Sequence, residues 1–230
     1  MQERGDDMSA RTSSAQRHRS AARRPSTRSE SKELTRKALL RAALTLLSRQ
    51  AFDSLSLREV TREAGISPTA FYRHFEDMEE LGLILVEESF GSLRDMVRDT
   101  RAQAGLTDEA ITRTLAVVLL HLHAHTSHFR FIARERYGGV RQLRRAIRRE
   151  LQLFVDELSV DLAAVANVDH WSSDDRRMLA SLLVETMVHM VAELLDARAD
   201  EEDAIIRQTE DRIRLITFGI PVWHSTGQAT

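Results

Sequence analysis

The chain has 230 residues, of which 42% are hydrophobic and only 3 are proline and 9 glycine. This composition can build a sizeable helical core, as one large domain or two small ones. The chain contains no cysteine, which excludes disulfides, cysteine-ligated zinc and thiol catalysis and is typical of a reducing compartment. No apolar run approaches the roughly 18 residues of a membrane span, and the N-terminus lacks the apolar segment of a signal peptide. We therefore expect a cytoplasmic protein with no membrane span.

The charged residues are distributed unevenly along the chain. Residues 1–78 contain 15 Lys and Arg against 10 Asp and Glu, a balance of +5, whereas residues 79–230 contain 18 against 25, a balance of −7. A basic N-terminal part on an acidic body indicates that only one end of the molecule meets a polyanion.

Residues 1–28 have the composition of a disordered basic arm. They are rich in Ser, Arg, Ala and Gln, and from Met8 to Ser29 there are six Arg and no acidic residue. A segment of this kind cannot form a packed core. Two interpretations stay open: a solvated tail, or an arm that follows the phosphates or the minor groove of DNA.

Two capping boxes mark the first helices of the domain predicted over residues 29–77. Thr27 with Glu30 precedes a helix predicted over 34–49, whose apolar stripe is expected to close a small core. Ser56 with Glu59 then starts a second helix, predicted over 57–64.

The third helix follows after a tight turn. Gly65 supplies the left-handed residue that ends the second helix. Ser67 and Pro68 then provide an N-cap and a first helical residue, and the third helix is predicted over 68–75. Two short helices joined across a glycine-containing turn predict a DNA-binding helix-turn-helix.

The remainder of the chain predicts a larger helical domain over residues 78–220, followed by a tail at 221–230. The last two of its helices have wide apolar faces and are expected to form a dimer interface as a four-helix bundle, although an ordinary core hairpin is the alternative. The fold class is therefore all-α. The expected helices span 78–101, a segment containing Ile111 to Leu122, 128–136, 140–166, 173–198 and 200–219.

The segments REAGIS (62–67) and FYRHF (71–75) resemble the DNA-binding half of TetR-family transcriptional repressors. This likeness covers roughly residues 32–85. Over residues 54–83, with SLSLREV, REAGI, FYRHF and ELGL, the chain resembles more closely the FabR- and DesT-type bacterial regulators of unsaturated-fatty-acid synthesis, and weaker likeness continues through 129–138 and 150–158. The resemblance implies a homodimer that binds a palindromic operator in double-stranded DNA and responds to long-chain acyl-CoA.

The helix-turn-helix supplies the candidate DNA contacts. Ser67 and Thr69 lie at the start of the recognition helix, where side chains face the groove. Tyr72 and His74 resemble the phosphate-contacting Tyr and His of the family, whereas Met78 stands where the family commonly has a Lys, so one phosphate contact is in doubt. The complete predicted DNA-binding set is Arg28, Arg36, Ser56, Arg58, Arg62, Ser67, Thr69, Tyr72 and His74.

The candidate ligand site combines apolar residues with arginines. From Arg134 to Arg149 there are seven Arg and one acidic residue, a pattern that suits either a phosphate-bearing head group such as that of coenzyme A or a solvated face. The apolar residues are equally consistent with plain core, and the resemblance implies that some of them line a tunnel for an acyl chain. The predicted ligand-binding set is Phe90, Met96, Val118, Phe129, Phe131, Arg134, Arg136, Arg145, Arg148, Phe154, Met187 and Met190.

Neither catalysis nor a metal site is predicted. His121 and His125 lie one helical turn apart, but no carboxylate or cysteine stands at ligand spacing, so capping or pocket polarity is the better interpretation. No nucleophile–base pair and no phosphate-binding glycine loop is present. We therefore expect a ligand-responsive repressor that is not an enzyme, has no cofactor besides its effector and controls fatty acid desaturation. The alternatives are a TetR-like regulator of another hydrophobic molecule, or an acyl-binding protein without a DNA function.

Overall fold

The structure, a computed structural model, describes residues 28–101 and 106–225, except for the side chains of Arg28, Ser92 and residues 95–101. The predicted basic arm and the end of the predicted tail therefore lie outside the described residues. Within them the protein is all-α, as predicted. The helices are α1 Arg28–Leu47, η1 Phe52–Ser54, α2 Leu57–Ala64, α3 Pro68–Phe71, α4 Met78–Arg101, α5 Asp108–Ala124, α6 Thr126–Glu135, α7 Arg141–Leu162, α8 Ser173–Asp196, α9 Glu202–Phe218 and η2 Ile220–Val222.

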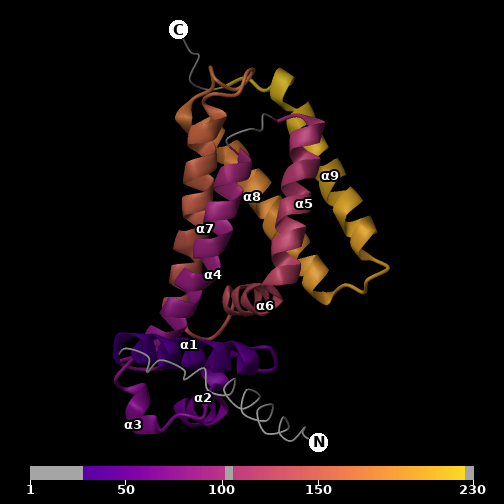
Figure 1. The fold of residues 1–230 in the computed structure, drawn as a ribbon. Coiled ribbons are helices and arrows are strands. Elements are labelled where there is room, and N and C mark those ends of the chain that lie inside the picture. Colours follow the sequence, from indigo (N-terminus) through magenta and orange to yellow (C-terminus); the bar gives the residue numbers. More distant parts are fainter. Residues whose placement is uncertain (1–27, 102–105, 226–230) are drawn as a thin grey trace, which may run out of the picture.

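The helices form a small lower part and a larger upper part (Figure 1). In the lower part α1 lies across α2 and α3. In the upper part α4, α5, α7, α8 and α9 run roughly along one another, and the short α6 lies crosswise at the lower end, close to α1. α6 is therefore one of the elements of the larger part that meet the helix-turn-helix.

Local capping explains the start of α2 and α3. The Ser56 hydroxyl accepts a hydrogen bond from the Glu59 amide, and the Glu59 carboxylate accepts one from the Ser56 amide at 2.9 Å, so the predicted capping box is present. Gly65 ends α2 with a φ of 67°, in the left-handed region that glycine adopts without strain. Ser67 caps α3 by accepting from the Ala70 amide.

Three predicted helix boundaries were wrong by four residues or more. α7 ends at Leu162 and not at residue 166, and the other two lie in α1 and α3. α1 begins at Arg28 and not at residue 34, because its first turns are exposed and polar and carry no apolar periodicity. α3 ends at Phe71 and not at residue 75. The chain tightens there, with the His74 amide donating to the Phe71 carbonyl at 2.8 Å, so that Phe71 and Phe75 are both buried with their rings 5.4 Å apart.

One hydrophobic core continues across the boundary predicted at residues 77 and 78. Leu39, Val60 and Phe71 of the helix-turn-helix belong to the same buried cluster as Leu85 of α4 and Ile147 of α7. A second cluster joins α5, α7, α8 and α9 further up. Because the lower core is shared, a movement of α4, α6 or α7 is transmitted to the helix-turn-helix by direct packing.

α8 differs from the other helices in its composition. By length and composition alone it is apolar enough to cross a membrane, contrary to the expectation from the sequence. Core helices meet the same criterion, and α8 packs against α7 and α9. Only a third of its most apolar stretch is buried within one chain (33%), and part of the remainder, including Val184, Met187 and Val191, lines an internal cavity.

Candidate DNA-binding surface and ligand cavity

The start of α3 presents small polar groups to solvent. Pro68 occupies the first turn of the helix, and Ser67, Pro68 and Thr69 are all exposed. The Ser67 hydroxyl oxygen accepts the cap hydrogen bond and keeps its O–H as a donor, and the Thr69 side chain is exposed beside it.

Tyr72 and His74 flank the same short helix. Tyr72 is 63% exposed, and its ring lies edge-on against Phe71 at 5.6 Å, which holds the phenol outward. His74 is half-buried, and burial, followed by the positive charges of Lys32 and Arg36, lowers its pKa. The cationic residues around His74 therefore disfavour its charged form in the free protein.

The predicted cationic contacts divide into exposed and engaged residues. Arg58 and Arg62 are exposed one turn apart on α2, as a DNA-facing pair requires. Arg36 is engaged instead, because its guanidinium lies 3.5 Å from the Glu88 carboxylate and over the Phe75 ring. The Ser56 side chain is engaged in the α2 capping box with Glu59. For Arg28 only the backbone is described, and it begins α1.

Two cations close to this surface were missed in the sequence. Lys32 and Arg73 are exposed and lie near enough to His74 to lower its pKa. Arg73 lies within the FYRHF segment but was not included in the predicted DNA-binding set. Lys32 lies in the part of α1 that apolar periodicity did not reveal.

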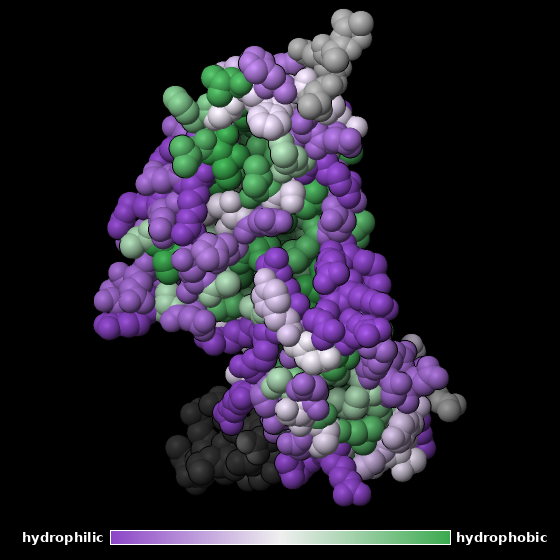
Figure 2. Space-filling model, turned by 180° about the vertical axis from the view of Figure 1, so that it is seen from behind, coloured by the Kyte–Doolittle hydropathy of each residue, from purple (hydrophilic) through white to green (hydrophobic). Residues whose placement is uncertain are grey.

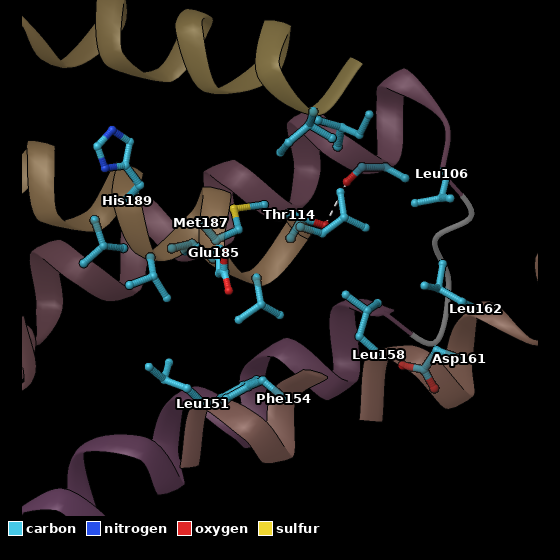
Figure 3. Close-up of a pocket in the computed structure, with 18 of the residues that line it drawn as sticks. Leu106, Thr114, Leu151, Phe154, Leu158, Asp161, Leu162, Glu185, Met187 and His189 are labelled. Carbon is cyan, nitrogen blue, oxygen red and sulfur yellow. Dashed lines mark hydrogen bonds between the residues drawn. The ribbon is translucent and has the colours of Figure 1, made fainter. Parts of the chain in front are cut away.

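A cavity of about 1240 Å³ lies in the upper part of the molecule. It exceeds the roughly 300–1,000 Å³ of pockets for drug-sized ligands. Leu151, Phe154 and Leu158 of α7 form one wall, Met187 of α8 faces them, and Leu106 and Thr114 come from the α5 side (Figure 3). Thr114 donates its hydroxyl to the Ala110 carbonyl at 2.8 Å, so this wall is effectively apolar. From the back of the molecule the cavity region is a hollow with hydrophobic walls and polar rims (Figure 2).

The predicted apolar ligand residues separate into those at the cavity and those elsewhere. The structure places Phe90, Val118, Phe129, Phe154 and Met187 in the cavity wall. Phe131 is buried against Phe52 of η1 instead, with ring centroids 6.4 Å apart. Met190 is fully buried in the upper core. The side chain of Met96 lies outside the described residues.

Among the predicted arginines, Arg136 lies at the cavity and Arg134 does not. Arg136 contributes to the cavity wall next to Tyr137, with its guanidinium 5.3 Å from the Tyr137 ring centre. Arg134 points the other way and donates to the carbonyls of Leu47 at 3.0 Å and Gln50 at 2.8 Å, at the end of α1. Neighbouring positions on a helix face different directions, which a count of charges along the sequence does not reveal.

The other arginines of this segment lie on the surface. Arg145 and Arg148 are exposed on α7 and do not contribute to the cavity wall. Arg144 donates to the carbonyls of Gly138 and Gly139, which fixes the turn between α6 and α7. The expected arginine cluster at a pocket mouth therefore reduces to Arg136.

Glu135 joins α6 to the helix-turn-helix and was not anticipated from the sequence. It is 1% exposed, and its Oε1 accepts a hydrogen bond from the Phe52 amide at 2.9 Å. Burial, opposed by this hydrogen bond, raises the pKa of the carboxyl. Gly138 leaves room for this position of the side chain, because a Cβ there would lie 2.1 Å from Glu135 Oε2 and would force the carboxylate to move. Arg134 and Glu135 together form what we call the α6 clamp.

The histidines cluster by ring contact. The His121 ring lies 4.4 Å from that of His125 and edge-on to Phe129, and burial lowers the pKa of both His121 and His128. In the described part of the chain no group of three or more His, Cys, Asp or Glu is placed to hold a metal ion.

Comparison with known proteins agrees with this geometry. Residues 39–83 match the family described as bacterial regulatory proteins, tetR family. In fold the chain is similar to the fatty acid degradation regulator FadR from Bacillus halodurans, with 16% identity, a TM-score of 0.65 and coverage of 80% of this chain and 95% of that one. It is also similar to FadR from Bacillus subtilis in complex with stearoyl-CoA, with 15% identity, a TM-score of 0.63 and coverage of 80% of this chain and 98% of that one. A third similar structure is a putative transcriptional regulator from Pseudomonas aeruginosa PAO1, with 17% identity, a TM-score of 0.67 and coverage of 83% of this chain and 91% of that one.

The matched residues include α2, α3 and the turn between them, which carry the exposed polar and cationic side chains described above. The fold similarity extends over the cavity-bearing helices as well. Residues 39–83 therefore match a DNA-binding domain of the tetR-family type, and the chain as a whole has the fold of these solved regulators.

Proposed function

We propose that the protein is a dimeric, cytoplasmic repressor that binds a palindromic operator and is controlled by long-chain acyl-CoA. The sequence resemblance to regulators of unsaturated-fatty-acid synthesis extends the proposal to genes of fatty acid desaturation. Saturated and unsaturated chains would then shift the DNA-binding equilibrium in opposite directions, because a cis double bond changes the shape of the chain within the cavity.

The position of α6 carries this proposal. Phe129, Ile132, Ala133 and Arg136 recur at helical spacing and line the cavity. The opposite face of the same helix holds Phe131 and the α6 clamp, which contact α1 and η1. A ligand that displaces α6 therefore acts directly on the helix-turn-helix. It can do so only by binding the two positions of α6 with different affinity.

The size and polarity of the cavity support a long apolar effector. Its volume of about 1240 Å³ and its mostly apolar walls, in which Asp161, Glu185 and His189 are polar exceptions, suit a flexible hydrocarbon chain. The Bacillus subtilis FadR of similar fold was solved with stearoyl-CoA, and an acyl chain of this kind would suit the large, mostly apolar cavity of the present chain.

Exposed apolar residues on the last two helices support a dimer. Met178 and Leu182 of α8 are 41% and 45% exposed, and Leu215 and Phe218 of α9 are 74% and 83% exposed. Apolar residues of this size are seldom left uncovered together. In a two-fold dimer through α8 and α9, the two α3 helices must lie about 34–36 Å apart to enter successive major grooves.

A gel-shift titration with the upstream region of the gene tests the proposal. We expect a specific band at low nanomolar protein that weakens with rising salt. Oleoyl-CoA and stearoyl-CoA should change the midpoint in opposite directions, and size-exclusion chromatography with light scattering should give twice the chain mass. A protein that yields no specific band on this DNA, or whose band responds to neither acyl-CoA, would contradict the proposal.

A further inference from the structure

The two ends of the cavity differ in polarity. At the end formed by α6, the half-buried Arg136 lies in the wall beside Tyr137, which is 78% exposed and marks where the cavity reaches solvent. Among the described residues no carboxylate lies within ion-pair distance of the Arg136 guanidinium, which lies over the Tyr137 ring. A half-buried cation that faces a cavity without a counter-ion is a site for an anionic group.

The charged residues outside the cavity are also distributed unequally between its two ends. α7 spans the length of the domain, about 33 Å for its 22 residues, from the arginine-rich start at the α6 end to the connection with α8. Residues 134–149 contain seven Arg and one acid, whereas residues 161–175 contain four Asp and no Lys or Arg. Arg176, which comes next, donates to the Trp171 carbonyl, and Arg177 pairs with Asp156. The potential therefore favours an anion at the α6 end.

The opposite end is covered by the C-terminal segment. Ile220 and Pro221 contribute to the cavity wall there. The segment is held by Ser225, whose hydroxyl donates to the buried Asp175 carboxylate at 2.5 Å and accepts from the Ser172 amide at 2.8 Å. Asp161 and Asn167, at the end of α7 and in the loop after it, also contribute to the cavity wall. This end therefore carries a carboxylate and not a cation, and it is fixed from the outside.

We propose that the cavity takes an amphipathic anion in one direction, with its carboxylate or phosphate at Arg136 and its apolar chain running toward Ile220. Arg136 determines head-group specificity and Ile220 sets the longest chain that fits. This inference rests on the proposed function and deepens it, because it states which end of the effector contacts α6. The residue that binds the head group directly follows the α6 clamp in sequence.

Head-group specificity is tested on the full chain with oleate, oleoyl-CoA and oleyl alcohol in native mass spectrometry and tryptophan-fluorescence titration. We expect wild-type protein to bind both anions at least about tenfold more tightly than the alcohol, the effect of one charge-assisted hydrogen bond. Arg136→Gln should lose that preference while its affinity for oleyl alcohol changes less than about twofold. Arg136→Lys should retain most of it, and the matched variant Arg145→Gln, which removes an exposed arginine outside the cavity, should behave as wild type.

Comparison of oleate with oleoyl-CoA shows whether Arg136 binds a carboxylate or a phosphate. A loss with Arg136→Gln for oleate assigns a carboxylate, and a loss for oleoyl-CoA alone assigns a phosphate; either supports the proposal. Equal binding of alcohol and anions by wild type, binding of none of the three, or equal effects of Arg136→Gln and Arg145→Gln would overturn it. Thermal melting by circular dichroism shows whether each variant is folded. If Arg136→Gln is unfolded, the preference of wild type and of Arg136→Lys for the anions over the alcohol decides whether the proposal holds.

Chain direction is tested by Ile220→Trp, which fills the distal end. We expect the preferred acyl length to shorten by several carbons with the anion preference unchanged, and an unaltered length profile would overturn the direction. Binding of these anions without any effect on operator affinity would contradict the proposed function and leave this inference standing. If an acyl-CoA changes operator affinity to the same extent in Arg136→Gln as in wild type, this inference is contradicted and the proposed function stands.

Discussion

The α6 clamp gives the sharpest test of how the cavity communicates with DNA. Replacement of Glu135 by Ala removes the acceptor of the Phe52 amide, which is buried and donates at 2.9 Å. A buried donor left without a partner costs about 1–3 kcal/mol. Allosteric coupling energies are themselves about 1–3 kcal/mol, so this contact is large enough to carry the coupling.

We therefore expect Glu135→Ala to reduce the effect of oleoyl-CoA on operator affinity by at least about fivefold, the equivalent of about 1 kcal/mol. Fluorescence anisotropy of labelled operator, with and without oleoyl-CoA, measures this effect. The affinity for oleoyl-CoA itself is measured separately and should change little, because Glu135 does not contribute to the cavity wall.

Glu135→Gln is the matched control. Its amide oxygen can still accept the Phe52 hydrogen bond and its size fits the space beside Gly138, so the ligand response should survive. A full ligand response in Glu135→Ala would refute the reasoning. An equal loss of response in both variants would show that the carboxylate charge, and not the hydrogen bond, carries the coupling.

Three further outcomes are expected. Gly82→Ala should destabilise the protein by about 1–3 kcal/mol in urea unfolding, because its Cβ would lie 2.6 Å from the Phe52 ring; an unchanged midpoint would show that this ring moves aside. Tyr72→Ala should weaken binding to specific and non-specific DNA alike and leave the slope of log affinity against log salt nearly unchanged, because the phenol is uncharged; a selective loss on the operator would instead assign it a base contact. Since burial lowers the pKa of His121 from 6.5, its contribution to stability should be complete above that pH and decline by up to about 1.4 kcal/mol per pH unit below it; urea titrations of wild type and His121→Gln at about pH 7.5 and pH 5.5 should show a smaller decline in the variant.

The local signals in the sequence were sufficient where a helix end depends on a few adjacent residues. α2 has the predicted bounds because its capping box and its left-handed Gly65 act within one turn of each end. α3 was predicted too long because its end depends on how Phe71 and Phe75 share the core, a contact made with other helices. Predictions that rested on local hydrogen bonds therefore succeeded more often than those that rested on packing.

The candidate ligand residues illustrate the same limit. Apolar spacing identified Phe90, Phe129 and Phe154 as inward-facing, and they contribute to the cavity wall. It gave Phe131 the same status, although that ring packs on η1. Residues that face inward look alike in a sequence, and only the arrangement of helices decides whether the space they face is cavity or core.

The sequence by itself determined the all-α class, the helix-turn-helix and its exposed polar residues, because these depend on composition, on periodicity and on caps within one or two turns. The tertiary structure alone decided how one short helix is used. It placed Arg136 at the cavity and Arg134 and Glu135 against α1 and η1. Three adjacent charged residues thus received two different roles, because the packing of α6 between two parts of the molecule fixes the direction in which each side chain points.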